Sequence, residues 1–511
     1  MIHFGKSFWC FWCDLSHPVV VVVISVILFN CDGGRRTSQL IWMQDLPATG
    51  SQSSARATDL NADGILDIVM GAGRNELQEW KQGIVAFDGR TGNLLWDQKA
   101  TDQIYGTASF IDITSDGTDD VVIGGRGTNF MALDGKTGGV LWQYEPVYES
   151  DPVLKYVRFN FNSSILVPDQ NNDGLADILT VNGGNSMAIP GSETDRFPSV
   201  LIVFDAKSGK ILAADTMPDG KESYMTPISF TQPDEEDPTI VFGTGGETLG
   251  GHLYMTKLSS LMKKSLRDAK IIATETGHGF VATPTAADVN GDGYFDIVAI
   301  SHGSTAIAID GKDQHTIWKQ TIPDTECSNS FSVGYFTDDA IPDFFTFVSQ
   351  GEWPNNTGSL QILINGSTGA VDYKSTIGCT GFSSPVAYDL NDDGMDEAII
   401  SVNKFDCNKG FVTESIDEIT SSVIAINFRT GTQQVIDQQQ GFKNIFSTPW
   451  IGDLDSNGYL DIVYSSYFSR GGLLAFLGMR TKRVELPVRI KQKVRWGEYM
   501  GSRRDGVFDP D

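Results

Sequence analysis

Basic residues are scarce in this chain, and the motifs of common enzymes are missing. Lys and Arg number 38 against 65 Asp and Glu, which gives a net charge of −27. No basic stripe exists that could neutralise phosphates, so nucleic acid is not an expected partner. The chain also lacks a nucleophile elbow, a P-loop and a zinc-protease motif. These absences favour a non-catalytic role.

Long apolar runs are missing too. The run Val19–Phe29 has 11 residues, too short for a confident transmembrane helix and typical of a signal-peptide core. It leads into LFNC, which resembles a bacterial lipobox that ends at Cys31. We therefore expect residues 1–31 to be a signal peptide with Cys31 lipidated, and residues 32–38 to be a linker. The protein would be exported, as an outer-membrane lipoprotein whose only membrane contact is its lipid. An uncleaved anchor or an ordinary secretory signal are alternatives that also imply export.

What the chain has instead is a nine-residue acidic loop that occurs six times. The copies begin at Asp59, Asp112, Asp169, Asp288, Asp389 and Asp453. Each places oxygen-bearing side chains at positions 1, 3, 5 and 9 and glycine at position 6, the inventory of a calcium site. The loop is not an EF-hand, because position 12 is never Glu. Turn chemistry alone could also explain it, but three carboxylates this close repel strongly unless a cation lies among them.

The loops mark a repeat of about 50–60 residues. Spacings of 53 and 57 residues separate the first three loops, and gaps of 119 and 101 residues later each hide one copy. The hidden copies are TQPDEEDPT from Thr231 and YFTDDAIPD from Tyr335, which lose all or part of the ligand pattern. The sequence therefore predicts eight repeats, six of them able to bind metal.

Each repeat predicts four antiparallel strands. An apolar run follows every acidic loop, and a strand, a tight Asp-Gly or Thr-Gly turn and another strand come next, as in Val85–Trp96. Eight such units predict an all-β, eight-bladed propeller over residues 39–490, with a tail at 491–511; seven blades plus an irregular unit is the alternative. Gln39–Gln44 is expected to supply the outer strand of the last blade, although Arg483–Ile490 could fill the same place.

The two halves of the repeat each resemble a known family. The acidic half resembles the FG-GAP or VCBS-type repeat of integrin-like propellers. The second half, clearest at Ala86–Trp96 and Ala132–Trp142, resembles the tryptophan-docking motif of PQQ-like propellers, which would make Trp96, Trp142 and Trp318 docking residues.

The FG-GAP resemblance implies that calcium is bound by the side chains at loop positions 1, 3, 5 and 9 and by the carbonyl at position 7. The expected ligands of about six calcium ions are then Asp59, Asn61, Asp63, Ile65 and Asp67; Asp112, Thr114, Asp116, Thr118 and Asp120; Asp169, Asn171, Asp173, Leu175 and Asp177; Asp288, Asn290, Asp292, Tyr294 and Asp296; Asp389, Asn391, Asp393, Met395 and Glu397; and Asp453, Asp455, Asn457, Tyr459 and Asp461.

The chain has only six cysteines. Removal of the signal peptide and acylation of Cys31 would leave Cys327, Cys379 and Cys407, an odd count that allows one internal disulfide at most. Cys379 and Cys407 fall in two loops on the same face of one predicted blade. We therefore expect these two to pair.

The ligand is expected on the face opposite the calcium loops. The loops between the second and third strands are long and unequal there, and variable loops on a rigid scaffold usually carry binding. Candidate residues on this face are Arg74, Glu76, Trp80, Arg126, Arg158, Trp353 and Arg470. His252, His278 and His302 also lie near it and could bind a transition metal or act in acid–base chemistry.

The expected function is a calcium-stabilised binding or scaffold propeller with a protein or glycan ligand. One alternative is a calcium-dependent polysaccharide lyase. A PQQ-type dehydrogenase is a weaker alternative, because the family resemblance would call for adjacent cysteines that the mature chain lacks.

Overall fold

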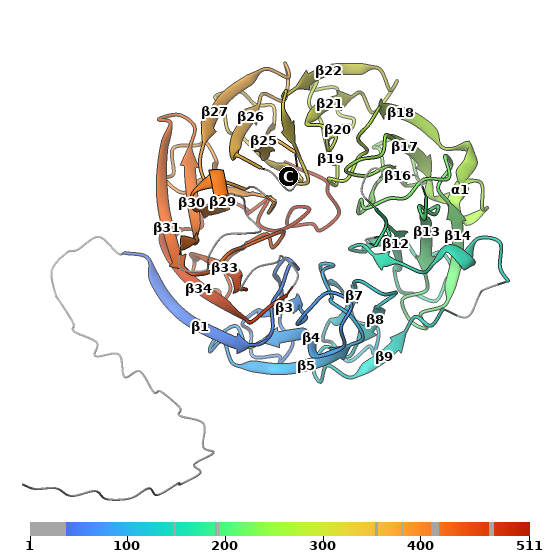
Figure 1. The fold of residues 1–511 in the computed structure, drawn as a ribbon, viewed down its shortest axis with the longest axis horizontal. Coiled ribbons are helices and arrows are strands. Elements are labelled where there is room, and N and C mark those ends of the chain that lie inside the picture. The colour runs from blue at the N-terminus through green and yellow to red at the C-terminus, as the bar shows by residue number, and fades with distance from the viewer. Residues whose placement is uncertain are drawn as a thin grey trace, which may run out of the picture. The chain divides into compact units, whose positions relative to one another are not determined.

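The computed structural model describes residues 37–146, 150–185, 187–189, 192, 194–352, 356–380, 382–409, 418–469 and 475–510. Over these residues the chain forms eight antiparallel sheets that follow one another around a ring (Figure 1). The eight-bladed propeller is therefore confirmed, and the alternative of seven blades plus an irregular unit is wrong. In the described part of the chain the only α-helix is the short α1 (Leu258–Met262).

The eight blades use the strands in chain order, except that β1 closes the last blade. Blades 1 to 4 are β2 (Arg56–Thr58), β3 (Asp67–Gly71), β4 (Trp80–Phe87) and β5 (Leu94–Ala100); β6 (Ser109–Ile111), β7 (Asp120–Gly124), β8 (Phe130–Leu133) and β9 (Val140–Gln143); β10 (Asn160–Phe161) with β11 (Ile165–Val167), β12 (Asp177–Gly183), β13 (Val200–Phe204) and β14 (Ile211–Thr216); and β15 (Ile228–Phe230), β16 (Thr239–Gly243), β17 (Gly251–Lys257) and β18 (Lys270–Glu275). Blades 5 to 8 are β19 (Thr285–Ala287), β20 (Asp296–Ile300), β21 (Thr305–Ile309) and β22 (Thr316–Thr321); β23 (Thr325–Glu326) with β24 (Ser332–Gly334), β25 (Asp343–Gln350), β26 (Gly358–Ile364) and β27 (Val371–Thr376); β28 (Val386–Tyr388), β29 (Glu397–Lys404), β30 (Thr420–Asn427) and β31 (Thr432–Gln440); and β32 (Trp450–Gly452), β33 (Tyr459–Phe468), β34 (Gly478–Arg489) and β1 (Gln39–Pro47).

Burial along each blade explains the sequence pattern. The second and third strands are the most buried, and β20 and β21 are buried at every residue, because neighbouring blades cover both faces of the sheet. These strands are therefore continuous apolar runs. The outer strands, such as β22, are only partly buried, and polar residues accordingly interrupt their apolar ones. Loop position 9 is the first residue of the second strand in five of the six complete loops, from Asp67 in β3 to Glu397 in β29, and the third residue in β33.

The two ends of the propeller meet in blade 8. β1 pairs with β34 from Gln39 opposite Glu485 to Pro47 opposite Gly478. The prediction that Gln39–Gln44 supplies the outer strand is confirmed. The competing prediction for Arg483–Ile490 is wrong, because Arg483–Arg489 belongs to the third strand, β34, whose residues Arg483–Glu485 pair with β1.

Tryptophans dock each blade onto the next at four junctions. The indole Nε1 of Trp96, Trp142 and Trp318 donates to the carbonyl oxygens of Gly135, Ala206 and Gly366, at 2.8, 2.7 and 2.6 Å. Trp42 of β1 donates in the same way to Gly89 in blade 1, at 2.8 Å. The ring is thus closed by the same kind of contact that joins blade 1 to 2, blade 2 to 3 and blade 5 to 6.

A glycine in the same turn makes room for each docked indole. At Gly92, φ is +73° and an added Cβ would lie 2.6 Å from Trp42. Gly431 is the equivalent residue of blade 7; its φ is +68°, and nothing lies within 4 Å of an added Cβ. Substituting alanine at each of these two glycines therefore separates the cost of backbone strain from the cost of crowding the indole.

We expect Gly92→Ala to lower the free energy of unfolding by about 2–5 kcal/mol, and Gly431→Ala by only about 1–2 kcal/mol. Both variants carry the strain of alanine at positive φ, and Gly92→Ala also overpacks the Trp42 contact, at about 1–3 kcal/mol. Denaturant unfolding of the two variants measures the difference. Equal losses would show that the docking contact contributes nothing at the closing junction.

The C-terminal segment fills the centre of the ring (Figure 1). Its backbone bonds to inner strands of several blades: Ala387 donates to Trp496, Ile451 to Gly497, and Ala286 to Gly506. Trp496, Met500, Val507 and Phe508 are all at most 2% exposed. Residues 491–510, expected only to be a tail, thus pack against the inner strands of the ring.

A buried charge network fixes this segment. The guanidinium of Arg56 on β2 is 1% exposed and lies 3.7 Å from Glu498. It also donates to the carbonyls of Ala108 and Tyr499, at 2.9 and 3.0 Å. Arg504 reaches the same glutamate at 2.8 Å. Burial lowers the pKa of Arg56 to about 10, so the guanidinium remains charged at neutral pH and the glutamate partly offsets the cost of burying it.

Candidate functional site

All six complete acidic loops share one hydrogen-bond frame. In the blade 1 loop, the position 1 carboxylate of Asp59 accepts from the Gly64 N–H at 2.9 Å. The position 5 carboxylate of Asp63 accepts from the N–H of Ile65 at 2.9 Å. The equivalent two bonds, at 2.8–3.0 Å, recur in the other five loops. Backbone donors thus pre-arrange oxygen side chains on one side of each loop, as a hard cation requires.

The position 9 acid is buried and joins the loop to the second hairpin of its blade. Asp67 is fully buried and accepts from the N–H groups of Leu60 and Gly89, both at 2.9 Å. Asp296 makes the same two contacts in blade 5. Burial raises the pKa of Asp67 and Asp296 to about 6, and that of Glu397 to about 7. A bound cation would favour the charged form of these carboxylates.

The blade 8 loop differs from the other five. Of the six loops, all fully described, only this one brings three carboxylates within 4.8 Å, those of Asp453, Asp455 and Asp461. Arg483 on β34, 1% exposed, lies among them. It contacts Asp461 at 2.8 and 2.9 Å, Asp455 at 2.7 Å and the Gly89 carbonyl at 3.0 Å. A guanidinium therefore already supplies the positive charge here.

The residues of the other five loops fit calcium better. Each has three acids, at positions 1, 5 and 9, and no buried guanidinium inserted between them. A buried carboxylate oxygen without a hydrogen-bond partner occurs in both kinds of loop, at Asp177 Oδ1 in blade 3 and at Asp455 Oδ1 in blade 8, so the inserted guanidinium is what distinguishes blade 8. The ligand sets of blades 1, 2, 3, 5 and 7 thus suit calcium, whereas that of blade 8 does not.

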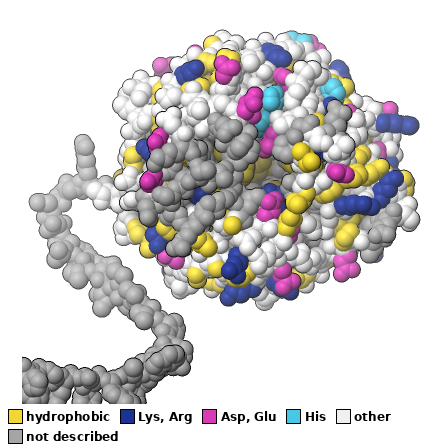
Figure 2. Space-filling model, viewed as in Figure 1, with side chains coloured by type: hydrophobic (Ala, Val, Ile, Leu, Met, Phe, Trp, Pro, Cys, Tyr) yellow, Lys and Arg dark blue, Asp and Glu magenta, His cyan; other side chains and the backbone are white. Residues whose placement is uncertain are grey.

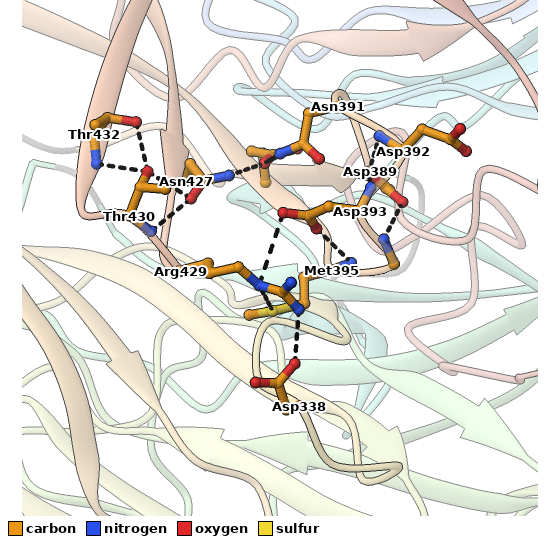
Figure 3. Close-up of polar contacts among 12 residues, drawn as sticks. Asp338, Asp389, Asn391, Asp392, Asp393, Met395, Asn427, Arg429, Thr430 and Thr432 are labelled. Atoms are coloured by element: carbon orange, nitrogen blue, oxygen red, sulfur yellow. Dashed lines mark hydrogen bonds and ion pairs between the residues drawn. The ribbon is translucent and has the colours of Figure 1, made fainter.

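Cations from neighbouring turns contact the exposed position 5 acids of some loops. In blade 7, the Arg429 guanidinium lies 3.8 Å from Asp393 and 2.7 Å from Asp338 of the blade 6 loop (Figure 3). Arg90 contacts Asp63 at 3.2 Å, and Lys136 contacts Asp116 at 2.8 Å. The three basic side chains are 42–58% exposed, so they can move aside at little cost, unlike Arg483.

The two degenerate loops keep structural contacts only. In blade 6, Ile341 still donates to Asp339 at 2.9 Å, and Thr337 donates to Asp343. In blade 4, Gln232 instead bonds to the backbone of Phe295 in blade 5. Hydrogen bonds within and between blades thus maintain these loops without the full ligand pattern.

Five of the seven predicted ligand-face residues lie in the described part of the chain, in three settings. Trp80 is half-buried, donates to the Thr49 hydroxyl at 2.9 Å and lies 5.0 Å from Arg74. Arg126 points into the centre, pairs with Glu76 at 2.7 Å and lies 5.3 Å from the Tyr105 ring. Arg158 is exposed and donates to the Lys155 carbonyl. Trp353, Arg470 and the lipidation residue Cys31 lie outside the described residues.

A cavity of about 480 Å³ opens at the centre of this face, where the space-filling view is hollowed (Figure 2). Its walls are the loops that lead into the inner strands and the loops between second and third strands. Tyr499 of the C-terminal segment also lines it, and the Tyr499 hydroxyl bonds to that of Thr283 at 2.7 Å. The segment that fills the ring therefore contributes to the cavity, which sequence analysis did not anticipate.

Charged side chains in the cavity are held in pairs. Arg196 contacts Glu222 and donates to the Tyr224 hydroxyl at 3.3 Å. His302 is 3% exposed; its Nε2 lies 3.8 Å from the Glu326 carboxylate, and its Nδ1 lies 3.4 Å from the Ser328 hydroxyl. The His278 and His302 ring centres are 5.6 Å apart. His252 bonds to Thr274 instead, so the three histidines do not form one cluster.

The cysteines follow the expected pattern. Cys379 and Cys407 form a disulfide with 5.1 Å between their Cα atoms. Cys327 is a buried free thiol, and burial raises its pKa to about 12. This thiol is therefore unreactive at neutral pH.

Two family models match parts of the chain. The model described as "Outer membrane protein assembly factor BamB" matches residues 34–226, and the FG-GAP repeat model matches residues 280–318. The eight-bladed propeller thus contains both PQQ-like and FG-GAP repeats. No curated protein matches the chain.

Solved structures share the fold at very low identity. Quinohemoprotein alcohol dehydrogenase ADHIIG from Pseudomonas putida HK5 is 9% identical, with a TM-score of 0.55 over 89% of this chain and 77% of that one. Saccharomyces cerevisiae Sqt1 is 8% identical, with a TM-score of 0.51 over 88% of this chain and 100% of that one. BamB from Moraxella catarrhalis is 12% identical, with a TM-score of 0.48 over 90% of this chain and 99% of that one. Structural similarity at such low sequence identity shows a propeller fold but does not indicate an activity. Among the described residues, no helix is long and apolar enough to cross a membrane.

Proposed function

We propose that this chain is an exported, calcium-stabilised binding propeller that holds a protein ligand on the face opposite its acidic loops. The observation that carries the proposal is the central cavity, built from unequal loops of that face and lined by Arg126, Arg196 and His302. The acidic loops are short and share one hydrogen-bond frame, so they have little freedom for recognition. Rigid blades with variable loops at one end are a usual arrangement for binding.

The family match supports a protein ligand and a place in the envelope. Its description names an outer-membrane protein assembly factor, a role in which proteins are the partners. A lipid on Cys31 would tether the propeller at the membrane, in keeping with the signal-peptide core at Val19–Phe29. A glycan ligand is the second possibility that the sequence raises, and the same face would hold it.

Crosslinking in cells can test which face binds the ligand; we call the proposed one, opposite the acidic loops, the working face. A photoreactive amino acid at Phe446, which lines the cavity and is 45% exposed, should capture a partner protein. The matched control places the same group at Val435, which is 50% exposed on the outer strand β31. Specific adducts from position 446 alone are the expected result. Adducts only from a third probe at Asp392, in an acidic loop, would reverse the assignment of the working face.

Calcium is expected to stabilise the native state, because its ligands are assembled only when the chain is folded. Excess chelator should lower the melting temperature by several degrees, as about 1 kcal/mol shifts it by about 2–4 °C in domains of 150–250 residues, and added calcium should restore it. Asp292→Ala should remove one calcium ion from the count, measured by metal analysis after dialysis. Glu235→Ala, the equivalent change in the degenerate blade 4 loop, should remove none. An unchanged melting temperature after verified metal removal would count against a structural role.

A further inference from the structure

Every blade carries a hydroxyl side chain two residues before its first strand, or before β11 and β24 in blades 3 and 6. The serines at this position are Ser54, Ser163, Ser330 and Ser384. The threonines are Thr107, Thr226, Thr283 and Thr448. All of them except Thr448 line the central cavity. Because the blades follow one another around the ring, these hydroxyl groups surround the cavity.

Three of the serines connect neighbouring blades. The Oγ atoms of Ser163, Ser384 and Ser54 accept from the N–H of the equivalent residue in the preceding blade, at 2.9, 3.1 and 3.0 Å. A hydroxyl that accepts such a bond keeps its own proton to donate. Contacts between blades therefore leave these three groups able to bond to a ligand.

Three other hydroxyls of the set have no partner in the protein. Thr107, Thr226 and Ser330 are at most 5% exposed. Among the described residues, none of their three side-chain oxygens makes a hydrogen bond, and each oxygen is open to the cavity. Polar groups this deep in a protein usually have a partner, so these three point to a molecule that occupies the cavity.

The rest of the cavity wall suits a small polar molecule. The amide side chains of Gln52 and Asn160 also line it, and Val281, Ala282 and Phe446 add apolar surface. Its volume of about 480 Å³ falls in the range of small-molecule sites, about 300–1,000 Å³. Hydroxyl and amide side chains can both donate and accept, which fits a ligand whose own polar groups do both.

We infer that the cavity binds an uncharged saccharide. The hydroxyl groups of the sugar would exchange hydrogen bonds with Thr107, Thr226 and Ser330, and the C–H groups of its ring would contact the apolar part of the wall. A site built to bond to ligand hydroxyls rejects molecules that leave its own polar groups unpaired. The inference rests on the working face of the proposed function and goes beyond it. The saccharide would occupy the cavity, whereas a protein partner would contact the rim, where Met187 and Ile189 are exposed.

Titration calorimetry on the whole protein tests this with maltose, cellobiose and N,N′-diacetylchitobiose. The comparison probe is acetyl-seryl-threonine amide, a peptide of similar size that also carries hydroxyl groups. At least one disaccharide should bind with a Kd below about 10 mM, and about ten-fold more tightly than the peptide.

Thr226→Val then tests one of the hydroxyls without a partner. It should weaken binding of that disaccharide about 2–10-fold, the effect of one neutral hydrogen bond. The melting temperature should not fall, because this hydroxyl bonds to nothing in the protein. Thr316→Val removes the same group from an exposed residue of β22 and should leave the affinity unchanged.

Four results would overturn the inference. These are no binding of any of the three disaccharides up to about 10 mM, binding of the peptide as tight as that of the best disaccharide, equal affinity of the Thr226→Val and unsubstituted proteins, or a melting temperature several degrees lower in Thr226→Val. The last result would give the hydroxyl a structural role. The crosslink from position 446 does not involve these probes, so the working face can be correct even if no saccharide binds.

Discussion

A chain that ends at Ile490 is expected to lose its cooperative fold. The truncation removes Trp496, Met500, Val507 and Phe508, each at most 2% exposed. Burial of each such side chain contributes about 1.5–3 kcal/mol, and together they approach the whole stability of an ordinary domain, about 5–15 kcal/mol. The truncation also leaves Arg56 buried without Glu498. Loss of the unfolding transition in calorimetry, with expression as aggregated protein, is the expected outcome.

The matched control for the truncation is Arg503→Ala. Arg503 lies in the same segment, but its side chain is 47% exposed, and its ion pairs among the described residues are with Asp505 and Asp509. Removing it should cost less than about 1 kcal/mol. A truncated protein that unfolds cooperatively near the temperature of the full chain would show that the ring is stable with an open centre.

Arg483→Met is expected to destabilise the calcium-free protein by about 3–5 kcal/mol, the usual cost of breaking a buried ion pair. The change leaves Asp461, which is fully buried, and Asp455 without their guanidinium. It also breaks the bond from Arg483 to the Gly89 carbonyl of blade 1. Chemical denaturation with excess chelator measures the loss.

Calcium should behave differently in the two proteins. The unsubstituted protein should bind five calcium ions, because Arg483 already occupies the place among the blade 8 acids. The Arg483→Met protein gains an open set of three carboxylates, so added calcium should recover part of its stability and the ion count should rise by one. Arg90→Met is the control, since Arg90 contacts the blade 1 loop from the surface and is 58% exposed. A count of six in the unsubstituted protein would show that Arg483 does not exclude the ion.

The features that were predicted correctly from the sequence are those encoded by patterns that recur in each repeat. Eight repeats, the four-strand blade and the docking of Trp96, Trp142 and Trp318 all follow from local patterns that recur. Gln39–Gln44 could be placed in blade 8 because its sequence, QLIWMQ, resembles that of the outer-strand segment NLLWDQ at Asn93–Gln98. The pairing of Cys379 with Cys407 followed from counting strands, since alternate loops of a blade emerge on the same face.

Features that depend on contacts between distant segments were not predictable. Arg483 lies in the third strand of its blade, and nothing in its local sequence indicates that it reaches Asp455 and Asp461 across the sheet. The equivalence of six loops in sequence therefore predicted six similar sites, although one contains a guanidinium. The C-terminal segment has no repeat pattern, so its place against Ala286, Ala387 and Ile451 could not be inferred.

By itself, the sequence determined the class of fold, the number of blades and the oxygen-rich loops, because hydrophobic period and turn chemistry act over a few residues and repeat along the chain. Only the tertiary structure decided which loop already holds a cation, what fills the ring and where a ligand cavity forms. These depend on closing the ring, which brings residues hundreds of positions apart within hydrogen-bond distance, as when Arg56 donates to the carbonyl of Tyr499.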